Sequence, residues 1–211
     1  MTNFDDLVKL LDEIEIEDMR QRNEGEEKEI RWRIISRDAA EFLSILARSV
    51  GAKQIVEIGT SVGYSTIWLA MVVRTFGGKV TSFEIDPKKI KLAQSHIDRA
   101  GLGKFVEIKL MDPIENQDQI PENIDLVLLD AEKSDYVAHF NSVYPKLRDG
   151  GVVIADNLVS HFDELKSYVE LVRNHENCSS AMLSSIGKGL ELTYKCLPKE
   201  SEINPWNEII R

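Results

Sequence analysis

Short apolar runs alternate along this chain with longer segments of helical periodicity, and this alternation restricts the fold more than any other feature of the sequence. The apolar runs are typical of strands and cover residues 54–58, 79–85, 105–110, 124–130 and 152–156. Helical spacing of apolar residues, ended by glycine or proline, marks residues 34–50, 65–75, 87–100 and 136–147. Strands separated by helices of this length form βαβ units, so the sequence predicts a parallel sheet with helices on both faces.

The rhythm changes near the end of the chain. Residues 179–186 and 190–196 flank the turn Gly187-Lys188-Gly189 and predict an antiparallel hairpin. The runs at 126–129 and 152–154 are apolar at every position, as expected of strands buried on both faces. We therefore expect an α/β fold with a doubly wound, mostly parallel sheet and an antiparallel hairpin at its edge.

The length of 211 residues is that of a single domain, which we place at residues 1–211. The first 30 residues hold eleven Asp or Glu and four Lys or Arg, and so carry most of the net charge of −10. Leu7, Leu10, Leu11 and Ile14 recur at helical spacing, so this acidic extension (about residues 1–30) is predicted to be an amphipathic helix with a solvated charged face. Because its apolar face needs a partner, we expect a homodimer.

Composition argues against several classes of protein. No apolar run approaches the ~18 residues of a membrane span, and residues 1–21 are too acidic for a signal peptide, so we expect a cytoplasmic protein. The acidic balance disfavours a broad nucleic-acid-binding face. Two cysteines are too few for a disulfide scaffold. A hairpin symmetric about Gly187 would set Cys178 opposite Cys196, within reach of a disulfide, although a reducing cytoplasm favours thiols.

A glycine-containing turn follows the first predicted strand. Gly59 and Gly63 let the backbone turn sharply and approach a ligand, although a plain strand–helix turn has the same spacing. Glu57 ends that strand, where a buried carboxylate needs a cation or hydrogen-bond donors. Glu84 ends the second strand, where a carboxylate can bind both hydroxyls of a ribose. The G-x-G-x-x-G spacing of a dinucleotide dehydrogenase is absent from this turn.

Acidic side chains also end the fourth and fifth predicted strands. Asp130 and Asp156 are expected at the carboxyl edge of the sheet, with Asn157 beside Asp156. Carboxylate and amide oxygens are the ligands that Mg²⁺ prefers. Acids at strand ends also cap the helices that follow. The residues alone leave metal binding and helix capping equally open.

Four motifs together resemble the S-adenosylmethionine-dependent O-methyltransferases, in the branch of the catechol and caffeoyl-CoA O-methyltransferases and their small prokaryotic relatives. They are Glu57-x-Gly59-x-x-x-Gly63-Tyr64-Ser65, Phe83-Glu84-Ile85-Asp86, Leu129-Asp130-Ala131-Glu132-Lys133 and Ala155-Asp156-Asn157. The resemblance covers about residues 34–195, with the motifs in the family's order. It implies a Rossmann-like methyltransferase fold and S-adenosylmethionine as cofactor.

The resemblance also implies which residues bind the cofactor: Glu57, Gly59, Thr60, Ser61, Gly63, Ser65, Glu84, Ile85, Asp112, Pro113 and Asp130. Glu57 would lie near its amino group, Ser65 at its carboxylate and Glu84 at the ribose hydroxyls. Ile85 would pack on adenine. Asp112 and Pro113 would cover the adenine edge, although the chain lacks the small residues usual there.

By the same resemblance Asp130, Asp156 and Asn157 would hold a divalent cation, Mg²⁺, and Lys133 would deprotonate the acceptor hydroxyl. The expected activity is metal-dependent methyl transfer to a hydroxyl of a small catechol-like or phenolic molecule. Two alternatives are a transfer-RNA hydroxyuridine O-methyltransferase and a non-catalytic S-adenosylmethionine-binding module. The four histidines form no ligand pattern and are interpreted as structural.

Overall fold

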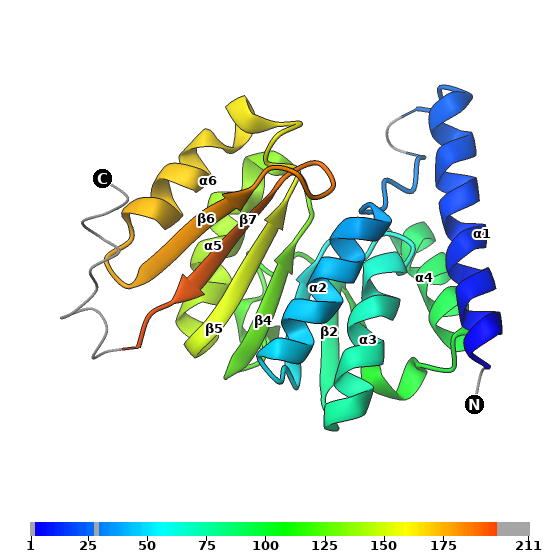
Figure 1. Ribbon diagram of the computed structural model, residues 1–211, viewed down its shortest axis with the longest axis horizontal. Helices are drawn as coiled ribbons and strands as arrows, with labels where there is room; N and C mark the ends of the chain where they lie inside the picture. The colour runs from blue at the N-terminus through cyan, green and yellow to red at the C-terminus, as the bar shows by residue number, and fades with distance from the viewer. Residues whose placement is uncertain (1–2, 28–29, 198–211) are drawn as a thin grey trace.

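A computed structural model describes residues 3–27 and 30–197 of the chain (Figure 1). Its strands are β1 (Gln54–Ile58), β2 (Lys79–Glu84), β3 (Val106–Leu110), β4 (Ile124–Leu129), β5 (Leu147–Asp156), β6 (Cys178–Leu183) and β7 (Leu190–Lys195). Its α-helices are α1 (Phe4–Asn23), α2 (Arg37–Ser49), α3 (Tyr64–Phe76), α4 (Pro87–Arg99), α5 (Tyr136–Val143) and α6 (Phe162–Asn174).

The seven strands form one sheet in the order β3-β2-β1-β4-β5-β7-β6. The first five strands of the chain pair in parallel, whereas β7 pairs antiparallel with both β5 and β6. The predicted doubly wound sheet with an antiparallel edge is therefore confirmed. The strand order changes direction between β1 and β4, which is where sheets of this kind bind ligands.

Two apolar cores lie on the two faces of the sheet. One joins β-strand residues such as Ile55 and Leu126 to α1, α2, α3 and α4. The other joins Val56 and Val127 to α5 and α6, where Tyr136 and Tyr168 pack edge to face at 5.6 Å between ring centres. Neighbouring residues of one strand thus enter opposite cores. This explains why residues 126–129 of β4 are apolar without alternation.

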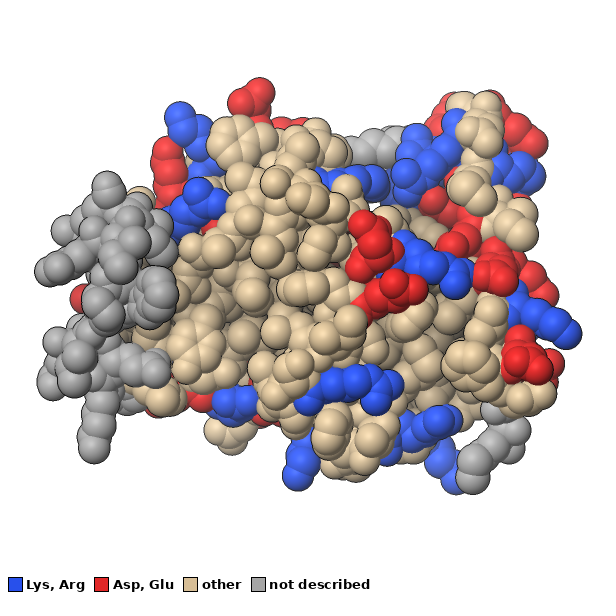
Figure 2. All heavy atoms as spheres, in the orientation of Figure 1, with Lys and Arg blue, Asp and Glu red and all other residues tan. Residues whose placement is uncertain are grey.

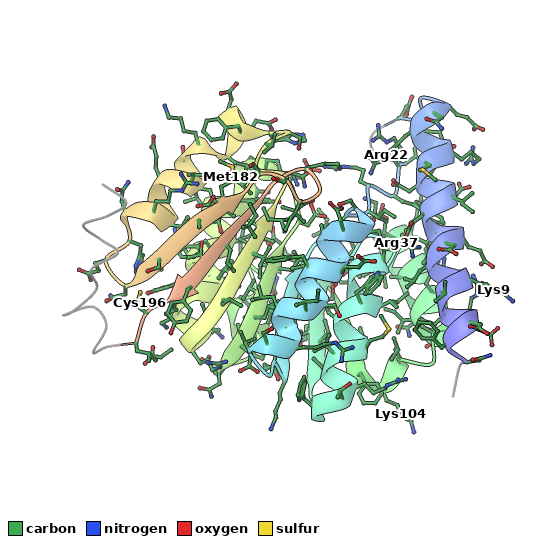
Figure 3. All side chains as sticks on the ribbon, in the orientation of Figure 1. Lys9, Arg22, Arg37, Lys104, Met182 and Cys196 are labelled. Atoms are coloured by element: carbon green, nitrogen blue, oxygen red, sulfur yellow. The ribbon has the colours of Figure 1, made fainter. Side chains whose placement is uncertain are left out.

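The acidic N-terminal segment is helical, as predicted, and its apolar face packs within the chain. Leu10, Leu11 and Ile14 are buried in the first core. Arg37 of α2 points toward α1 (Figure 3) and forms ion pairs with Asp12 and Glu15. Acidic and basic side chains intermingle over the exposed side of α1 (Figure 2). No helix among the described residues is long and apolar enough to cross a membrane.

The largest differences from the expected elements fall after β4. The helix predicted at residues 136–147 ends at Val143 and continues as the 3₁₀ turn Tyr144–Lys146, because Pro145 cannot supply a helical N–H. β5 begins at Leu147 and contains the glycines at 150 and 151 that were taken to precede it. Helix α6 was missed, although Leu165, Tyr168 and Val172 have helical spacing.

The condition for opposed cysteines, a hairpin symmetric about Gly187, is not met. Cys178 pairs with Lys195, one position short of Cys196, so the hairpin is not symmetric about Gly187. Cys196 lies just beyond the end of β7 (Figure 3). Both cysteines are buried, and neither forms a disulfide among the described residues, as a reducing environment favours. The register differs by one residue from the symmetric one, so the two side chains do not occupy directly opposed positions of the ladder.

Candidate active site

A cavity of about 450 Å³ opens at the carboxyl edge of the parallel strands. Its wall comes from the loops that follow β1 to β5, from the segment between α1 and α2, and from the β6–β7 turn. This volume is ordinary for a small-molecule site. We call the region around Glu84 and Ile85 the β2 end, and the region around Asp130 and Asn157 the β4–β5 end.

The glycine turn after β1 brings the backbone close to the neighbouring strand. Gly59 has a φ of 101°, and a Cβ there would lie 2.3 Å from the carbonyl oxygen of Asp130. A side chain at this position would therefore push β1 and β4 apart. Gly63, with a φ of 85°, is the N-cap of α3, and a Cβ there would press on Ala93. Both positions of this turn therefore require glycine for steric reasons.

Glu84 is held at the β2 end by backbone donors. Its carboxylate accepts hydrogen bonds from the N–H groups of Ser61 (2.8 Å), Ile85 (2.9 Å) and Asp86 (3.0 Å). The residue is 9 % exposed and lines the cavity. Three donors fix the orientation of the carboxylate at the cavity wall, which suits recognition of a diol. Ile85 beside it is exposed, as an apolar surface for a flat ring would be.

Glu57 lies deeper, behind the glycine turn. It is fully buried and accepts hydrogen bonds from the hydroxyls of Ser65, Thr66 and Ser82. Burial raises the pKa of Glu57 to about 7, against the opposing effect of those hydroxyls. Thr60 in turn shares a hydrogen bond with Ser82. This buried network holds the glycine turn to the ends of β1 and β2.

The cavity divides the predicted cofactor residues into two sets. Those that line it are Gly59, Ser61, Glu84, Ile85, Asp112, Pro113 and Asp130. Those that lie behind its wall are Glu57, Thr60, Gly63 and Ser65. Direct contact of Glu57 and Ser65 with a cofactor stays a prediction, since in this geometry they bind each other.

The β4–β5 end brings together the three residues predicted to bind metal. Asp130 follows β4, Asp156 ends β5, and Asn157 has a φ of 74° that turns the chain sharply. The amide nitrogen of Asn157 donates to Asp130 Oδ1 (2.9 Å) and Asp156 Oδ2 (3.0 Å). Burial and the nearby charge of Asp130 raise the pKa of Asp156 to about 7.

The donor set fits a divalent cation. Asp156 Oδ1 is buried and has no hydrogen-bond partner among the described residues. Two carboxylates that repel each other and one orphaned oxygen are stabilised by a positive charge. Turning the Asn157 amide over would add its oxygen to the set. The described residues hold no cluster of three His, Cys, Asp or Glu side chains suited to a metal, so the oxygen set of two acids and one amide is the candidate.

Helix capping does not explain these acids. Helices α5 and α6 begin at Tyr136 and Phe162, with Asp135 and His161 in the cap positions. Neither cap residue makes a side-chain capping bond. Asp130 and Asp156 therefore stand outside both helices. Asp135 lines the cavity and accepts a hydrogen bond from Ser134 instead.

Lys133 is anchored beside Asp130 rather than exposed. Its Nζ donates to the carbonyl of Ala131 (2.8 Å), the hydroxyl of Tyr136 (3.1 Å) and Asp130 Oδ1 (3.3 Å). Its side chain is 4 % exposed. The Tyr136 hydroxyl also reaches the carbonyls of Leu129 and Asp156. Sequence reasoning gave Tyr136 no such role; its position three residues after Lys133 was the available signal.

Several cavity residues were missed by sequence reasoning: Arg31, Arg33, His139, His161 and Lys188. The structural interpretation of the histidines suits His96, which binds the Val62 carbonyl and packs on Trp32. For His139 and His161, which line the cavity, it stays a prediction. Arg33 spans the cavity mouth to Glu132 (2.7 Å). The neighbouring backbone carbonyl of Trp32 accepts the Ser61 hydroxyl.

The sequence pattern of the O-methyltransferase family matches residues 11–171. The chain is similar to a catechol O-methyltransferase of Niastella koreensis (36 % identity; 59 % of this chain, 58 % of the relative). It is also similar to a catechol O-methyltransferase of Mycobacterium tuberculosis (34 % identity; 59 % and 57 %). The matches span less than three fifths of either relative. A solved O-methyltransferase from Bacillus cereus, in complex with SAH, superposes with a TM-score of 0.76 at 27 % identity (89 % and 90 % covered).

Proposed function

Because the chain belongs to the O-methyltransferase family, we propose that it transfers the methyl group of S-adenosylmethionine to a hydroxyl of a small catechol-like or phenolic molecule with the help of a divalent cation. One observation carries this proposal. A single cavity is lined by an anchored carboxylate, Glu84, at its β2 end and by Asp130 and Asn157 at its β4–β5 end, where Asn157 joins Asp130 to the buried Asp156. A cofactor and an acceptor would meet between them.

The β2 end would bind the adenosine part of the cofactor. Glu84 would accept hydrogen bonds from both ribose hydroxyls, since its backbone donors already fix the carboxylate. Ile85 would pack on adenine, and Asp112 and Pro113 would cover the adenine edge. The methionine and ribose side would be formed by the turn that contains Gly59, Thr60, Ser61 and Gly63. Asp130 would lie beside it, next to Gly59. Glu57 and Ser65 would act at the amino and carboxylate groups of the methionine.

Asp130, Asp156 and Asn157 would hold the cation, which we assign as Mg²⁺ because the donors are all oxygen. When bound there, Mg²⁺ supplies a positive charge that acidifies and orients the acceptor hydroxyl. Lys133 would take the hydroxyl proton at Nζ. To accept it, Nζ must be the neutral amine, whose two N–H groups would donate to the Ala131 carbonyl and the Tyr136 hydroxyl and leave the lone pair for the proton.

Two alternatives are less well supported. A transfer-RNA hydroxyuridine O-methyltransferase would need a basic surface, whereas the chain has a net charge of −10. A non-catalytic S-adenosylmethionine-binding module would have no use for a buried lysine hydrogen-bonded to Asp130. We also propose a cytoplasmic location, which the lack of a disulfide between the two described cysteines supports.

We retain the homodimer as a proposal, on different grounds. The buried face of α1 finds its partner inside the chain, so it no longer argues for a second copy. Ile45 of α2 and Ile16 and Met19 of α1 are large apolar side chains that remain exposed. Light scattering tests this proposal, and a monomer at all accessible concentrations would contradict it.

The test of the activity is methyl transfer from labelled S-adenosylmethionine to catechols, flavonoids and transfer RNA, with Mg²⁺ and with excess EDTA. We expect labelled catechol or phenol products only when Mg²⁺ is present. Full turnover in EDTA would refute the metal requirement. Cofactor binding without turnover of any acceptor would favour the binding module, and labelled transfer RNA would favour the first alternative.

A further inference from the structure

Two basic side chains in the cavity wall are not used by the proposed reaction. Arg31 belongs to the segment between α1 and α2, and Lys188 is the central residue of the β6–β7 turn. Both line the cavity together with Asn157. We call Arg31 and Lys188 the basic pair. Because they come from distant parts of the chain, only the fold brings them to one cavity.

Two other basic side chains, Arg33 of the cavity wall and Lys133 beside Asp130, already have partners. Arg33 pairs with Glu132 at 2.7 Å, and Lys133 with Asp130 at 3.3 Å. The basic pair differs from them. Arg31 Nε is buried without a hydrogen-bond partner in the described part of the chain. Within residues 3–27 and 30–197, Lys188 forms no side-chain hydrogen bond or ion pair.

The backbone of the turn fixes where Lys188 stands. Its carbonyl accepts the N–H groups of Val159 (2.8 Å) and Ser160 (3.3 Å), and the Gly189 carbonyl accepts that of Leu158 (2.9 Å). On the other side, Gly187 N–H donates to Asp38 at the start of α2. The turn is therefore clamped between α2 and the loop that carries Asn157.

The electrostatic surroundings of Lys188 leave its charge available to a ligand. Arg22, which reaches from the end of α1 toward the following segment (Figure 3), repels it and binds Asp18 and the Ile34 carbonyl. Burial and this repulsion lower the pKa of Lys188. Asp130 and Asp156 attract it from a distance, but a cation at their own site would cancel that attraction.

We propose that Arg31 and Lys188 bind an anionic group of the methyl acceptor, a carboxylate or a phosphate, while its hydroxyl lies at Asp130 and Asn157. This inference rests on the proposed function and narrows its substrate class to acidic phenols or catechols. An anion in the cavity would neutralise the Arg31 guanidinium, whose buried Nε has no partner among the described residues, and would offset the charge of Lys188. Its position would also fix which end of the acceptor faces the carboxylate pair.

The test compares two catechols that differ in one charge, 3,4-dihydroxybenzoate and its neutral amide. Calorimetry measures their binding to protein saturated with S-adenosylhomocysteine and Mg²⁺. We expect the acid to bind about tenfold more tightly or better, the scale of one charged hydrogen bond. The preference should shrink as ionic strength rises. 3,4-Dihydroxyphenyl phosphate replaces the acid in a second arm, to distinguish a phosphate site from a carboxylate site.

Variants locate the effect. Lys188→Met and Arg31→Met should each remove most of the preference for the acid, whereas Lys188→Arg should keep it. Lys89→Met is the matched control, because Lys89 lines the β2 end of the same cavity. Circular dichroism checks that each variant is folded. A preference that survives in both Met variants, or is absent from the wild type for both anions, overturns the inference.

The outcome for the proposed function is read separately. Methylation of the neutral amide with no preference for either anion would uphold the function and overturn the basic pair. A preference that depends on Lys188 without any methylation would uphold the anion site and count against the function. Failure of all three compounds to bind would overturn the inference.

Discussion

The two ends of the cavity differ in how complete they are without a ligand. At the β2 end, three backbone N–H groups satisfy Glu84. At the β4–β5 end, Asp156 keeps a buried oxygen without a partner in the described part of the chain and a pKa raised to about 7 by burial and Asp130. The carboxylate at the first end is satisfied without a ligand, whereas the proposed cation would stabilise the second. Variants at the two ends should therefore fail in different ways.

The largest effect is expected from Asp156→Ala. Loss of this carboxylate removes a charged cation ligand, and activity should fall by at least ~100-fold, the scale of lost electrostatic stabilisation. Affinity for S-adenosylmethionine should change far less, because Glu84 and the glycine turn are untouched. Steady-state kinetics and calorimetry measure the two quantities. Asp135→Asn, in a cavity carboxylate outside the trio, is the control. Equal losses of rate and of cofactor affinity would contradict the assignment of separate tasks to the two ends of the cavity.

Lys133→Ala tests the chemistry at the same end. Loss of a general base should lower kcat by about 100-fold near pH 7, the low end of the usual range. The defect should shrink at higher pH, where the acceptor hydroxyl ionises unaided, and Mg²⁺ binding should persist. Lys133→Arg keeps the charge but cannot release a proton at these pH values, so it should not restore the rate. Restoration by arginine would assign Lys133 a positioning role instead.

The β2 end was the easier of the two ends to predict from sequence. Glu84 and Gly59 belong to one strand–turn–helix segment each, so local patterns fix their place at the sheet edge. Asp130, Asp156 and Asn157 were also found, because parallel strands end at one edge. Helical and strand periodicity predicted the sheet and most of the helices for the same local reason.

The remaining features depend on contacts between distant segments. Lys188 lies in a glycine turn whose position is set by Asp38 and by the loop at Val159, which no local pattern reveals. Arg31 and Arg33 sit in a connecting segment without periodicity. The register of the cysteine hairpin was open for the same reason, because a turn of several residues leaves a one-residue shift to be decided by tertiary packing.

Glu84→Ala should produce the opposite pattern to Asp156→Ala. Two ribose hydroxyls lose a charged acceptor, so S-adenosylmethionine should bind more weakly by about 2 kcal/mol or more, roughly 30-fold. Mg²⁺ binding should be retained. Asp86→Ala is the matched control, since Asp86 caps α4 through Lys88 N–H and lies beside Glu84. Unchanged affinity in calorimetry would remove Glu84 from the cofactor site.

The smallest effect is expected from Glu57→Gln, which tests whether buried Glu57 is an unsatisfied acid, like Asp156, or a satisfied carboxylate, like Glu84. The folded-state pKa of Glu57, about 7, lies above its ordinary value of 4.5. The folded protein therefore holds the proton more tightly than the unfolded chain does. That stabilisation is complete below pH 4.5 and is lost as the pH rises through 7. The wild type should lose up to about 2 kcal/mol from this group between pH 5 and 7.

Glutamine cannot ionise, so the variant should show a flatter dependence of Tm on pH. Thermal unfolding of both proteins in EDTA from pH 5 to 8 measures this difference, and Asp156, which titrates in the same window, contributes equally to both. Glu107→Gln is the control, because Lys79 lowers the pKa of Glu107 and it titrates below the window. Parallel curves for wild type and Glu57→Gln would mean that Glu57 is already ionised. Its three hydroxyl donors would then satisfy the charge as fully as the backbone satisfies Glu84.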